Sequence, residues 1–196
     1  MRILFFAAIL CAALLSPAAT LASEISQRAA LEQIEERLQK APQMLGRFTQ
    51  KKTLPQLPRP LLSSGVVALS EERGVSWRVV EPIASHLILN EAQAGDDLLA
   101  KQIAYPLLQI FRGNFAALEQ LFRVEAQMLD NRWEVTLEPK DSALAKFVSS
   151  IEVSGNSSIE RIRLAEASAA ITEMQLLELQ PVSDSDPQFT AEFSQQ

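Results

Sequence analysis

Hydrophobic and polar residues alternate along most of this chain, which predicts that β-strands dominate its fold. In the clearest case Trp133, Val135 and Leu137 alternate with charged residues and a threonine, as in a strand with one buried face. Other short stretches bounded by glycine, proline or turn residues predict strands at 44–52, 62–69, 75–80, 85–90, 147–153, 159–165 and 170–179, and a last strand through Phe189, Ala191 and Phe193. Short strands at this spacing favour one curved antiparallel sheet or barrel.

A helical pattern precedes the strands. Between residues 25 and 40, Leu31, Ile34 and Leu38 recur at the spacing of one helix face, and most charged residues lie on the other faces. We expect an amphipathic helix here that ends at the following proline. Three prolines within residues 54–60 remove three backbone donors, so this stretch predicts a stiff, extended loop between the first two strands.

The segment from Leu98 to Phe122 breaks the strand pattern. It is mostly apolar, Pro106 and Gly113 divide it, and Asn114 is placed to cap a helix start. We expect two short apolar helices inserted between strands of the sheet. The pattern alone favours a core role, with the helices packed permanently on one sheet face. The alternative is a lid, because helices that cover the concave face of a curved sheet enclose an apolar pocket suited to acyl chains.

Residues 1–22 have the pattern of a secretory signal peptide. A positive start at Arg2 precedes an apolar run that is too short to span a bilayer, which disfavours the alternative of a membrane anchor, and a small residue stands before Ser23. We expect cleavage there, which leaves residues 23–196 as a single domain. This domain has no cysteine, because Cys11 lies in the leader, and an exported domain without disulfides fits a bacterial periplasm.

Charge and composition exclude several classes of function. The chain has a formal net charge of −6, whereas nucleic-acid binding needs clustered Lys and Arg. A single histidine excludes a multi-histidine metal site, and the sequence has neither a glycine-rich phosphate loop nor a G-x-S-x-G motif. His86 follows Ser85, but neighbours on a strand point to opposite faces, so these two do not form a nucleophile and base. We expect no enzyme activity, no cofactor and no metal.

Several motifs follow one another in a characteristic order. Phe48 and Gln50 form an F-x-Q pattern in the first predicted strand, and Gly65 opens the next strand. Trp77 follows twelve residues later and begins a W-x-x-x-x-P pattern, and residues 133–140 form a strand that ends in L-x-P-K. Together with the N-terminal helix and the late strands, these motifs cover nearly all of the mature chain, which resembles the LolA-type periplasmic carriers of outer-membrane lipoproteins.

The resemblance implies an α+β fold: an incomplete curved antiparallel β-barrel, or half-barrel, with an N-terminal helix and short lid helices over a hydrophobic cavity. It implies a periplasmic protein that binds acyl chains of lipoproteins and shuttles them from the inner to the outer membrane. Its partners would be the acylated cargo, an inner-membrane transporter as donor and an outer-membrane acceptor, and we expect a monomer. Two alternatives stay open: a carrier of a non-protein lipid, such as a glycolipid or polyene-lipid precursor, and a periplasmic interaction module that transports nothing.

The candidate lipid-binding residues are large apolar side chains of the predicted strands and lid, with Trp77 and Phe115 foremost. They are Phe48, Trp77, Leu87, Leu107, Leu108, Phe111, Phe115, Leu118, Phe122 and Trp133. Family carriers pin the lid with an arginine between the motif glycine and tryptophan. This chain has Glu71 at that spacing, and Arg73, two residues further on, is the candidate lid latch.

Overall fold

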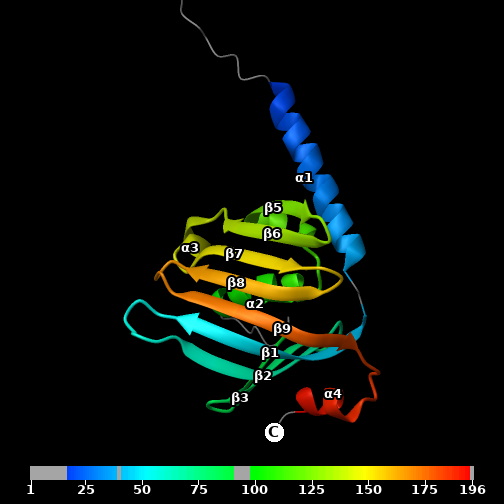
Figure 1. Cartoon of the computed structure of the whole chain (residues 1–196), viewed down its shortest axis with the longest axis vertical. Helices are drawn as coiled ribbons and strands as arrows, with labels where there is room; N and C mark the ends of the chain where they lie inside the picture. The colour runs from blue at the N-terminus through cyan, green and yellow to red at the C-terminus, as the bar shows by residue number, and fades with distance from the viewer. Residues whose placement is uncertain (1–16, 39–40, 91–97, 195–196) are drawn as a thin grey trace, which may run out of the picture.

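In a computed structural model, the described residues are 17–38, 41–90 and 98–194, and they form one nine-stranded antiparallel sheet with helices on both of its faces (Figure 1). The strands lie in the order β4-β3-β2-β1-β9-β8-β7-β6-β5. The first four strands therefore extend the sheet outward from its centre, and the last five return from the far edge until β9 pairs with β1. The expected half-barrel is confirmed, because the two edge strands do not pair with each other.

The elements have the following bounds. The helices are α1 (Pro17–Arg37), α2 (Leu98–Phe111), α3 (Ser142–Ala145) and α4 (Pro187–Glu192), with one 3-10 helix, η1 (Ala116–Gln120). The strands are β1 (Gln43–Thr53), β2 (Leu61–Ser70), β3 (Gly74–Glu81), β4 (Ser85–Leu89), β5 (Phe122–Leu129), β6 (Arg132–Pro139), β7 (Val148–Gly155), β8 (Ile159–Glu166) and β9 (Ile171–Pro181). All predicted strands except the last are confirmed. Residues 1–16 of the predicted leader lie outside the described residues.

Strand alternation places α2 and α4 on opposite faces of the sheet. Trp77 of β3 faces the ring of Phe111 on α2, with centroids 6.1 Å apart. Its neighbour Arg78 instead binds Glu192 of α4. Because successive side chains of a strand point to opposite faces, α2 covers the inner, concave face and α4 covers the outer face. Figure 1 shows α2 behind the sheet and α4 near the free end of the β1–β4 half.

The segment predicted as the last strand is helix α4, so that prediction was wrong. Asp186 caps the helix, since its side chain accepts hydrogen bonds from the N–H groups of Gln188 and Phe189, and Pro187 occupies the first turn. Phe189 and Phe193 are four residues apart, which places their rings edge to face on one helix side with centroids 5.2 Å apart. A four-residue spacing fits one helix face as well as one strand face, and the cap decides between them.

Strand β5 was not predicted from the sequence. The apolar insert was expected to remain helical through Phe122, but η1 ends at Gln120 and Phe122 starts β5, which pairs with β6. Arg123 and Glu125 are exposed and alternate with more buried residues, which is a strand pattern. This pattern was not recognised because the apolar insert runs directly into the strand. The prediction that Pro106 divides the insert was also wrong, because α2 runs through it and ends just before Gly113.

Helix α1 packs along the edge strand β5. The predicted helix-face residues Leu31 and Ile34 are buried in the core, 5% and 0% exposed. The side-chain oxygen of Gln27 accepts a hydrogen bond of 2.8 Å from the backbone N–H of Ala126 on β5. Helix α1 ends at Arg37, earlier than predicted, and it begins at Pro17, inside the predicted leader. The helix therefore covers one of the two edges of the open sheet (Figure 1).

Candidate functional site

Three aromatic rings from β1, β3 and α2 meet on the concave face. Phe48 stacks on Trp77 with ring centroids 3.7 Å apart and an interplanar angle of 26°, and Phe111 lies on the other side of Trp77. Phe48 is buried, whereas Trp77 and Phe111 are half-buried. The rings thus connect the lid helix α2 to the half of the sheet that contains β1 to β4.

Gly65 makes this stacking possible because it has no side chain. It lies opposite Phe48 in the pairing of β1 with β2. A Cβ atom at this position would lie 1.9 Å from the carbonyl oxygen of Arg78 and 2.9 Å from Cε1 of Phe48. The Phe48 ring therefore reaches across β2 to Trp77 on β3. The motif residues Phe48, Gly65 and Trp77 belong to one packing arrangement.

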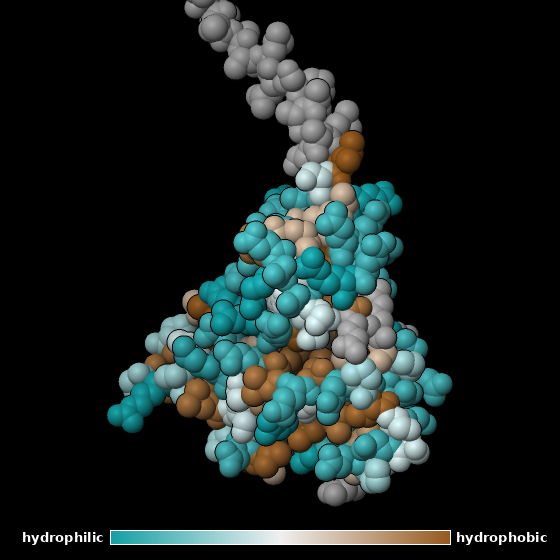
Figure 2. Space-filling view, turned by 45° about the vertical axis from the view of Figure 1, so that its right-hand side comes forward, coloured by the Kyte–Doolittle hydropathy of each residue, from teal (hydrophilic) through white to brown (hydrophobic). Residues whose placement is uncertain are grey.

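A cavity of about 580 Å³ adjoins the aromatic cluster at one end of the sheet. Its apolar wall includes a cross-strand row in which Met44 pairs with Leu69 and Leu69 pairs with Val75. Leu108 and Phe111 of α2 form the lid side of the cavity. In Figure 2 an apolar, brown area is visible below α1 between hydrophilic side chains. The cavity therefore lies between a lid helix and a wall of three strands.

The rim of the cavity is polar. Ser70, Glu71, Arg112, Asn114 and Ser158 line it together with the apolar wall. One rim contact joins the lid to the sheet, because Nη2 of Arg112 donates a hydrogen bond of 3.2 Å to the backbone carbonyl oxygen of Glu71. An arginine at the end of α2 thus contacts the β2–β3 turn.

Gly113 ends the lid helix with a left-handed backbone, at φ +63°. A Cβ atom here would lie 2.6 Å from Cδ1 of Leu38, which follows α1. Glycine therefore serves two purposes at this position: it permits the turn, and it lets the lid approach the end of α1. Asn114, the predicted helix cap, accepts a 3.3 Å hydrogen bond from the N–H of Ala117 in η1.

Arg73, the candidate lid latch, contacts the outer-face helix. Its Nη2 atom lies 2.6 Å from Oδ1 of Asp184, in the segment between β9 and α4. Its guanidinium lies over the rings of Phe189 and Phe193, 5.5 and 5.7 Å from their centroids. These contacts hold α4 against the β2–β3 turn. The arginine that reaches this turn from the lid is Arg112.

The ten candidate lipid-binding residues fall into three groups. Those with 0–1% exposure are Phe48, Leu108, Phe115, Leu118, Phe122 and Trp133. Trp77, Leu107 and Phe111 are half-buried, and Leu87 is 53% exposed. Only two of the ten line the cavity, Leu108 and Phe111. The wall residues Met44, Leu69 and Val75 were not predicted from the sequence, because they become neighbours only through strand register.

Phe115 and Trp133 pack together beneath η1. Their ring centroids lie 5.8 Å apart at 63°, and both side chains are fully buried. Trp133 lies close to Gly155, where a Cβ atom would come within 3.0 Å of its ring, and its Nε1 donates to the carbonyl oxygen of Asn156. This group is part of the buried core beneath η1.

A polar cluster lies on the outer face beneath α4. Arg78 donates from Nε to Oε2 of Glu192 at 2.9 Å, and a second bond from Nη2 makes the pair bidentate. The hydrogen bond with the Glu192 carboxylate raises the pKa of Arg78 above its usual value, against a smaller desolvation effect. Oγ of Ser76 lies 2.7 Å from Nε2 of His86, so the partner of His86 is the cross-strand Ser76. Sequence order did not indicate this pair.

The described residues contain neither a metal-binding cluster nor a membrane-spanning helix. Among residues 25–38, 41–90 and 105–194, no group of three or more His, Cys, Asp or Glu side chains is arranged to hold a metal ion. Over the described part of the chain, no helix is both long enough and apolar enough to cross a membrane.

One protein family matches part of the chain, including helix α2 on the lid side of the cavity. Residues 98–183 match the family described as outer membrane lipoprotein carrier protein LolA-like. The matched segment starts at the lid helix and continues to the end of β9. No match is found among curated proteins. Over this segment the chain is similar to the LolA-like carriers, as the motifs in its sequence predict.

Solved structures with a similar chain trace come from three bacteria. A LolA superfamily protein from Nitrosomonas europaea is 12% identical, with a TM-score of 0.43 over 83% of this chain and 96% of that chain. A putative outer membrane lipoprotein-sorting protein domain from Vibrio parahaemolyticus is 9% identical, with a TM-score of 0.43 over 86% and 100%. A DUF1329 family protein from Desulfovibrio piger is 7% identical, with a TM-score of 0.38 over 83% and 96%. The fold assignment given above rests on the strand order itself.

Proposed function

We propose that this protein is a periplasmic carrier that binds acyl chains of lipoproteins under helix α2 and moves them from the inner to the outer membrane. The observation that carries the proposal is the cavity of about 580 Å³ between α2 and the wall of β1, β2 and β3. Its volume lies within the usual range for small-ligand sites, roughly 300–1,000 Å³. The family match begins at this lid helix, which supports the same function.

The apolar wall suits an acyl chain for an energetic reason. Each buried CH₂ group contributes about 0.8 kcal/mol, and the membrane offers the chain the same gain. A carrier must therefore provide a surface that is nearly as apolar as lipid. The row of Met44, Leu69 and Val75, together with Leu108 and Phe111, forms the apolar part of the lining, and the polar rim forms the rest.

When the cargo leaves, the lid must be able to fill the space that the acyl chain occupied. Phe111 and Trp77 are half-buried beside the cavity, whereas Leu108 is 1% exposed and anchors α2. In this proposal, rotation of the Phe111 and Trp77 rings exchanges protein for acyl chain. The Arg112 contact with the Glu71 carbonyl fixes the closed position of the lid end.

A second candidate cargo is a non-protein lipid such as a glycolipid. The observation that favours it is the polar rim, where Ser70, Asn114 and Ser158 line the cavity together with the charged residues Glu71 and Arg112. Hydroxyl and amide groups in this position suit a sugar or another hydrogen-bonding headgroup. The acyl part would occupy the same wall in either case. The transport route, from an inner-membrane donor to an outer-membrane acceptor, is what the resemblance to LolA-type carriers implies and is part of the proposal.

Native mass spectrometry of the protein purified gently from the periplasm tests the proposal. A bound triacylated protein supports lipoprotein transport, and a bound free lipid supports the second candidate. The matched variants are Phe111→Ser at the cavity and Leu129→Ser, an exposed position on the far edge strand. We expect Phe111→Ser to lose bound lipid and Leu129→Ser to retain it. A protein that comes off empty and also fails to bind a fluorescent fatty acid contradicts both candidates.

A further inference from the structure

Exposed apolar side chains gather at one end of the sheet. We call the surface formed by residues 54–62 and 80–87 the tip. Six of the eleven large hydrophobic side chains that are exposed among the described residues belong to it, which makes it a cluster and not the usual scatter. The six are Leu57, Leu61, Leu62, Val80, Ile83 and Leu87. Ile83 is the most exposed of them, at 79%.

The two segments of the tip are neighbours in space. Strands β2 and β3 pair with Ser64 opposite Glu81, so the β1–β2 loop and the β3–β4 loop leave the sheet at the same end. Figure 1 shows the β1–β2 loop projecting beyond the strands. Its three prolines restrict the backbone, so the loop keeps its apolar residues outside at a small entropic cost. The tip is thus a stiff projection with exposed leucine and isoleucine.

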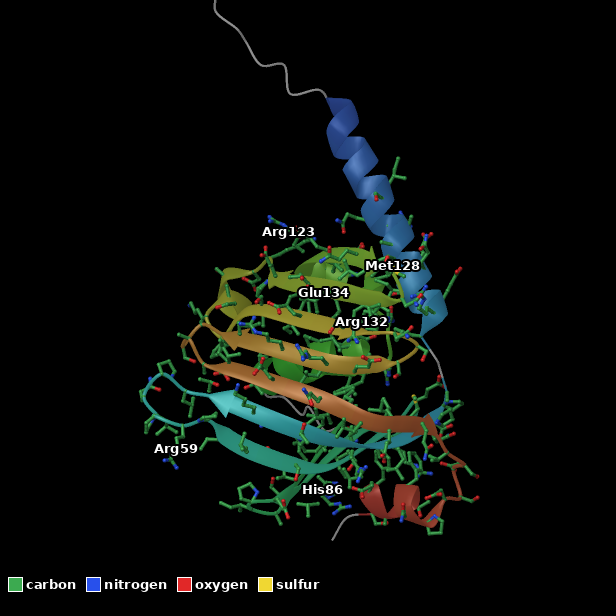
Figure 3. All side chains as sticks on the ribbon, in the orientation of Figure 1. Arg59, His86, Arg123, Met128, Arg132 and Glu134 are labelled. Carbon is green, nitrogen blue, oxygen red and sulfur yellow. The ribbon has the colours of Figure 1, made fainter. Side chains whose placement is uncertain are left out.

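The charge of the tip differs from that of the whole chain. The chain has a formal net charge of −6, but residues 54–62 contain no carboxylate and residues 80–87 contain only Glu81. Arg59 is the basic residue of the β1–β2 loop, and it forms no ion pair with any residue that the structure describes. Figure 3 shows its side chain pointing away from the loop into solvent. An apolar surface with a single outward cation is complementary to a phospholipid headgroup layer.

One tip residue, Leu87, connects the tip with the aromatic stack, whereas the cavity lies toward the opposite end of β2 and β3. Leu87 pairs with Trp77, and Trp77 pairs with Val67, so the three share the concave face of neighbouring strands. Leu87 is 53% exposed, Trp77 is half-buried and Val67 is 0% exposed. Exposure therefore falls step by step from the tip to the stack that adjoins the cavity. This row is an apolar path between the molecular surface and the lid.

We propose that the tip is a membrane-contacting surface, which enters the headgroup–acyl boundary of a bilayer while lipid passes along the row from Leu87 to Trp77. Leu62 and Ile83 provide the inserted apolar groups, and Arg59 contacts lipid phosphates. The contact is shallow and reversible, because the acidic remainder of the protein is repelled by an anionic bilayer. This inference rests on the proposed lipid-carrier function.

Flotation with vesicles of phosphatidylethanolamine and phosphatidylglycerol tests the inference. The variant is the double substitution Leu62→Ser with Ile83→Ser, and the matched control is Leu129→Ser, at 49% exposure on β5. We expect the wild-type protein and the control to float with the vesicles. The fraction of the tip variant that floats should be at least fivefold lower than that of the wild-type protein. Binding should persist at high salt, since apolar contacts are not screened. Arg59→Ser should weaken binding more to vesicles that contain anionic phosphatidylglycerol than to vesicles of phosphatidylethanolamine alone.

A fluorescent fatty-acid assay on the same proteins separates this inference from the carrier function. If the wild-type protein binds the fatty acid but does not float, the membrane contact is refuted and the carrier function stands. If it floats but binds no fatty acid, the carrier function fails, although the membrane contact remains. A tip variant that floats like the wild-type protein overturns the inference. Light scattering gives a second way to overturn it. If the wild-type protein is a dimer and the tip substitutions make it a monomer, the tip binds a second copy of the chain and not a membrane.

Discussion

The ring of Phe48 lies face to face with the ring of Trp77, with centroids 3.7 Å apart, and this pair links the first and third strands across β2. The strand between them contributes no side chain at the crossing, because Gly65 lies opposite Phe48. One missing side chain thus brings together two residues that are almost thirty positions apart in the sequence. The stability of this half of the sheet should therefore depend on glycine at position 65.

Gly65→Ala should therefore destabilise the protein. The added methyl group meets the Arg78 carbonyl oxygen at 1.9 Å, so the backbone of β3 has to move. Overpacking of this kind costs about 1–3 kcal/mol in the free energy of unfolding. Urea denaturation followed by tryptophan emission measures the change. Ser63→Ala on the same strand is the control and should remain near the wild-type value, and a Gly65→Ala protein of unchanged stability would contradict the packing described here.

Phe111 and Phe115 should separate binding from folding. Phe115 is fully buried against Trp133, so Phe115→Ala should lower the free energy of unfolding by about 3–5 kcal/mol. Phe111 is half-buried at the cavity, so Phe111→Ala should cost less stability but weaken fatty-acid binding by about tenfold, which corresponds to about 1.4 kcal/mol. Denaturation and fluorescence titration of both variants give the comparison. Equal losses of binding and stability in the Phe111 variant would place that residue in the core.

Arg112 should control the closed position of the lid. Its donor contacts the backbone carbonyl of Glu71, so the Glu71 side chain is not needed for this bond. Arg112→Ala should loosen the end of α2 and shift the emission of Trp77, read in a Trp133→Phe background where it is the remaining tryptophan. Glu71→Ala is the control and should leave the emission unchanged. If both variants shift the emission equally, the contact is made through the carboxylate.

The Arg78–Glu192 pair should stabilise α4 on the outer face. Glu192 is 5% exposed and accepts a bidentate contact, so Glu192→Gln should cost about 1–2 kcal/mol in unfolding free energy after allowance for the partial exposure of Arg78. Glu178→Gln breaks a solvent-exposed pair with Arg47 and should change stability by less than about 0.5 kcal/mol. Urea midpoints of the two variants decide between a structural and a peripheral role for α4.

The same pair allows a prediction about pH. The hydrogen bond to Glu192 raises the pKa of Arg78, so its contribution is fully present below the ordinary arginine pKa and is lost only when pH rises beyond it. The guanidinium therefore remains charged across the neutral range. Titration of Arg78 should therefore not change the stability difference between the wild-type protein and Glu192→Gln. Unfolding experiments at mildly acidic, neutral and mildly basic pH measure this difference.

Most of the fold was predictable from the sequence, because it depends on local alternation. The strand through Trp133, Val135 and Leu137 shows this best, since its buried and exposed positions are as predicted. Helix α4 was missed because its phenylalanines are spaced as in a strand, and the cap by Asp186 is a weaker signal than that spacing. Strand β5 was missed because its apolar start continues the pattern of the insert.

The candidate site was only partly predictable, for a different reason. Trp77 and Phe111 were recognisable as large apolar residues in the appropriate segments. The wall row of Met44, Leu69 and Val75 comes from three strands. These residues are neighbours because of strand register, which cannot be read from the sequence. Phe115 has the same chemistry as Phe111, so composition does not separate a residue of the core from one at the cavity.

The hydrogen bond from the Ala126 N–H to Gln27 has a consequence for self-association. Edge strands with free N–H groups are templates on which another chain can add a strand, and this is a common start of aggregation. A glutamine side chain from α1 occupies one such donor on β5, at the place where a foreign carbonyl group would bind. Gln27 therefore removes one of the donors on β5 through which a second chain could begin a polymer.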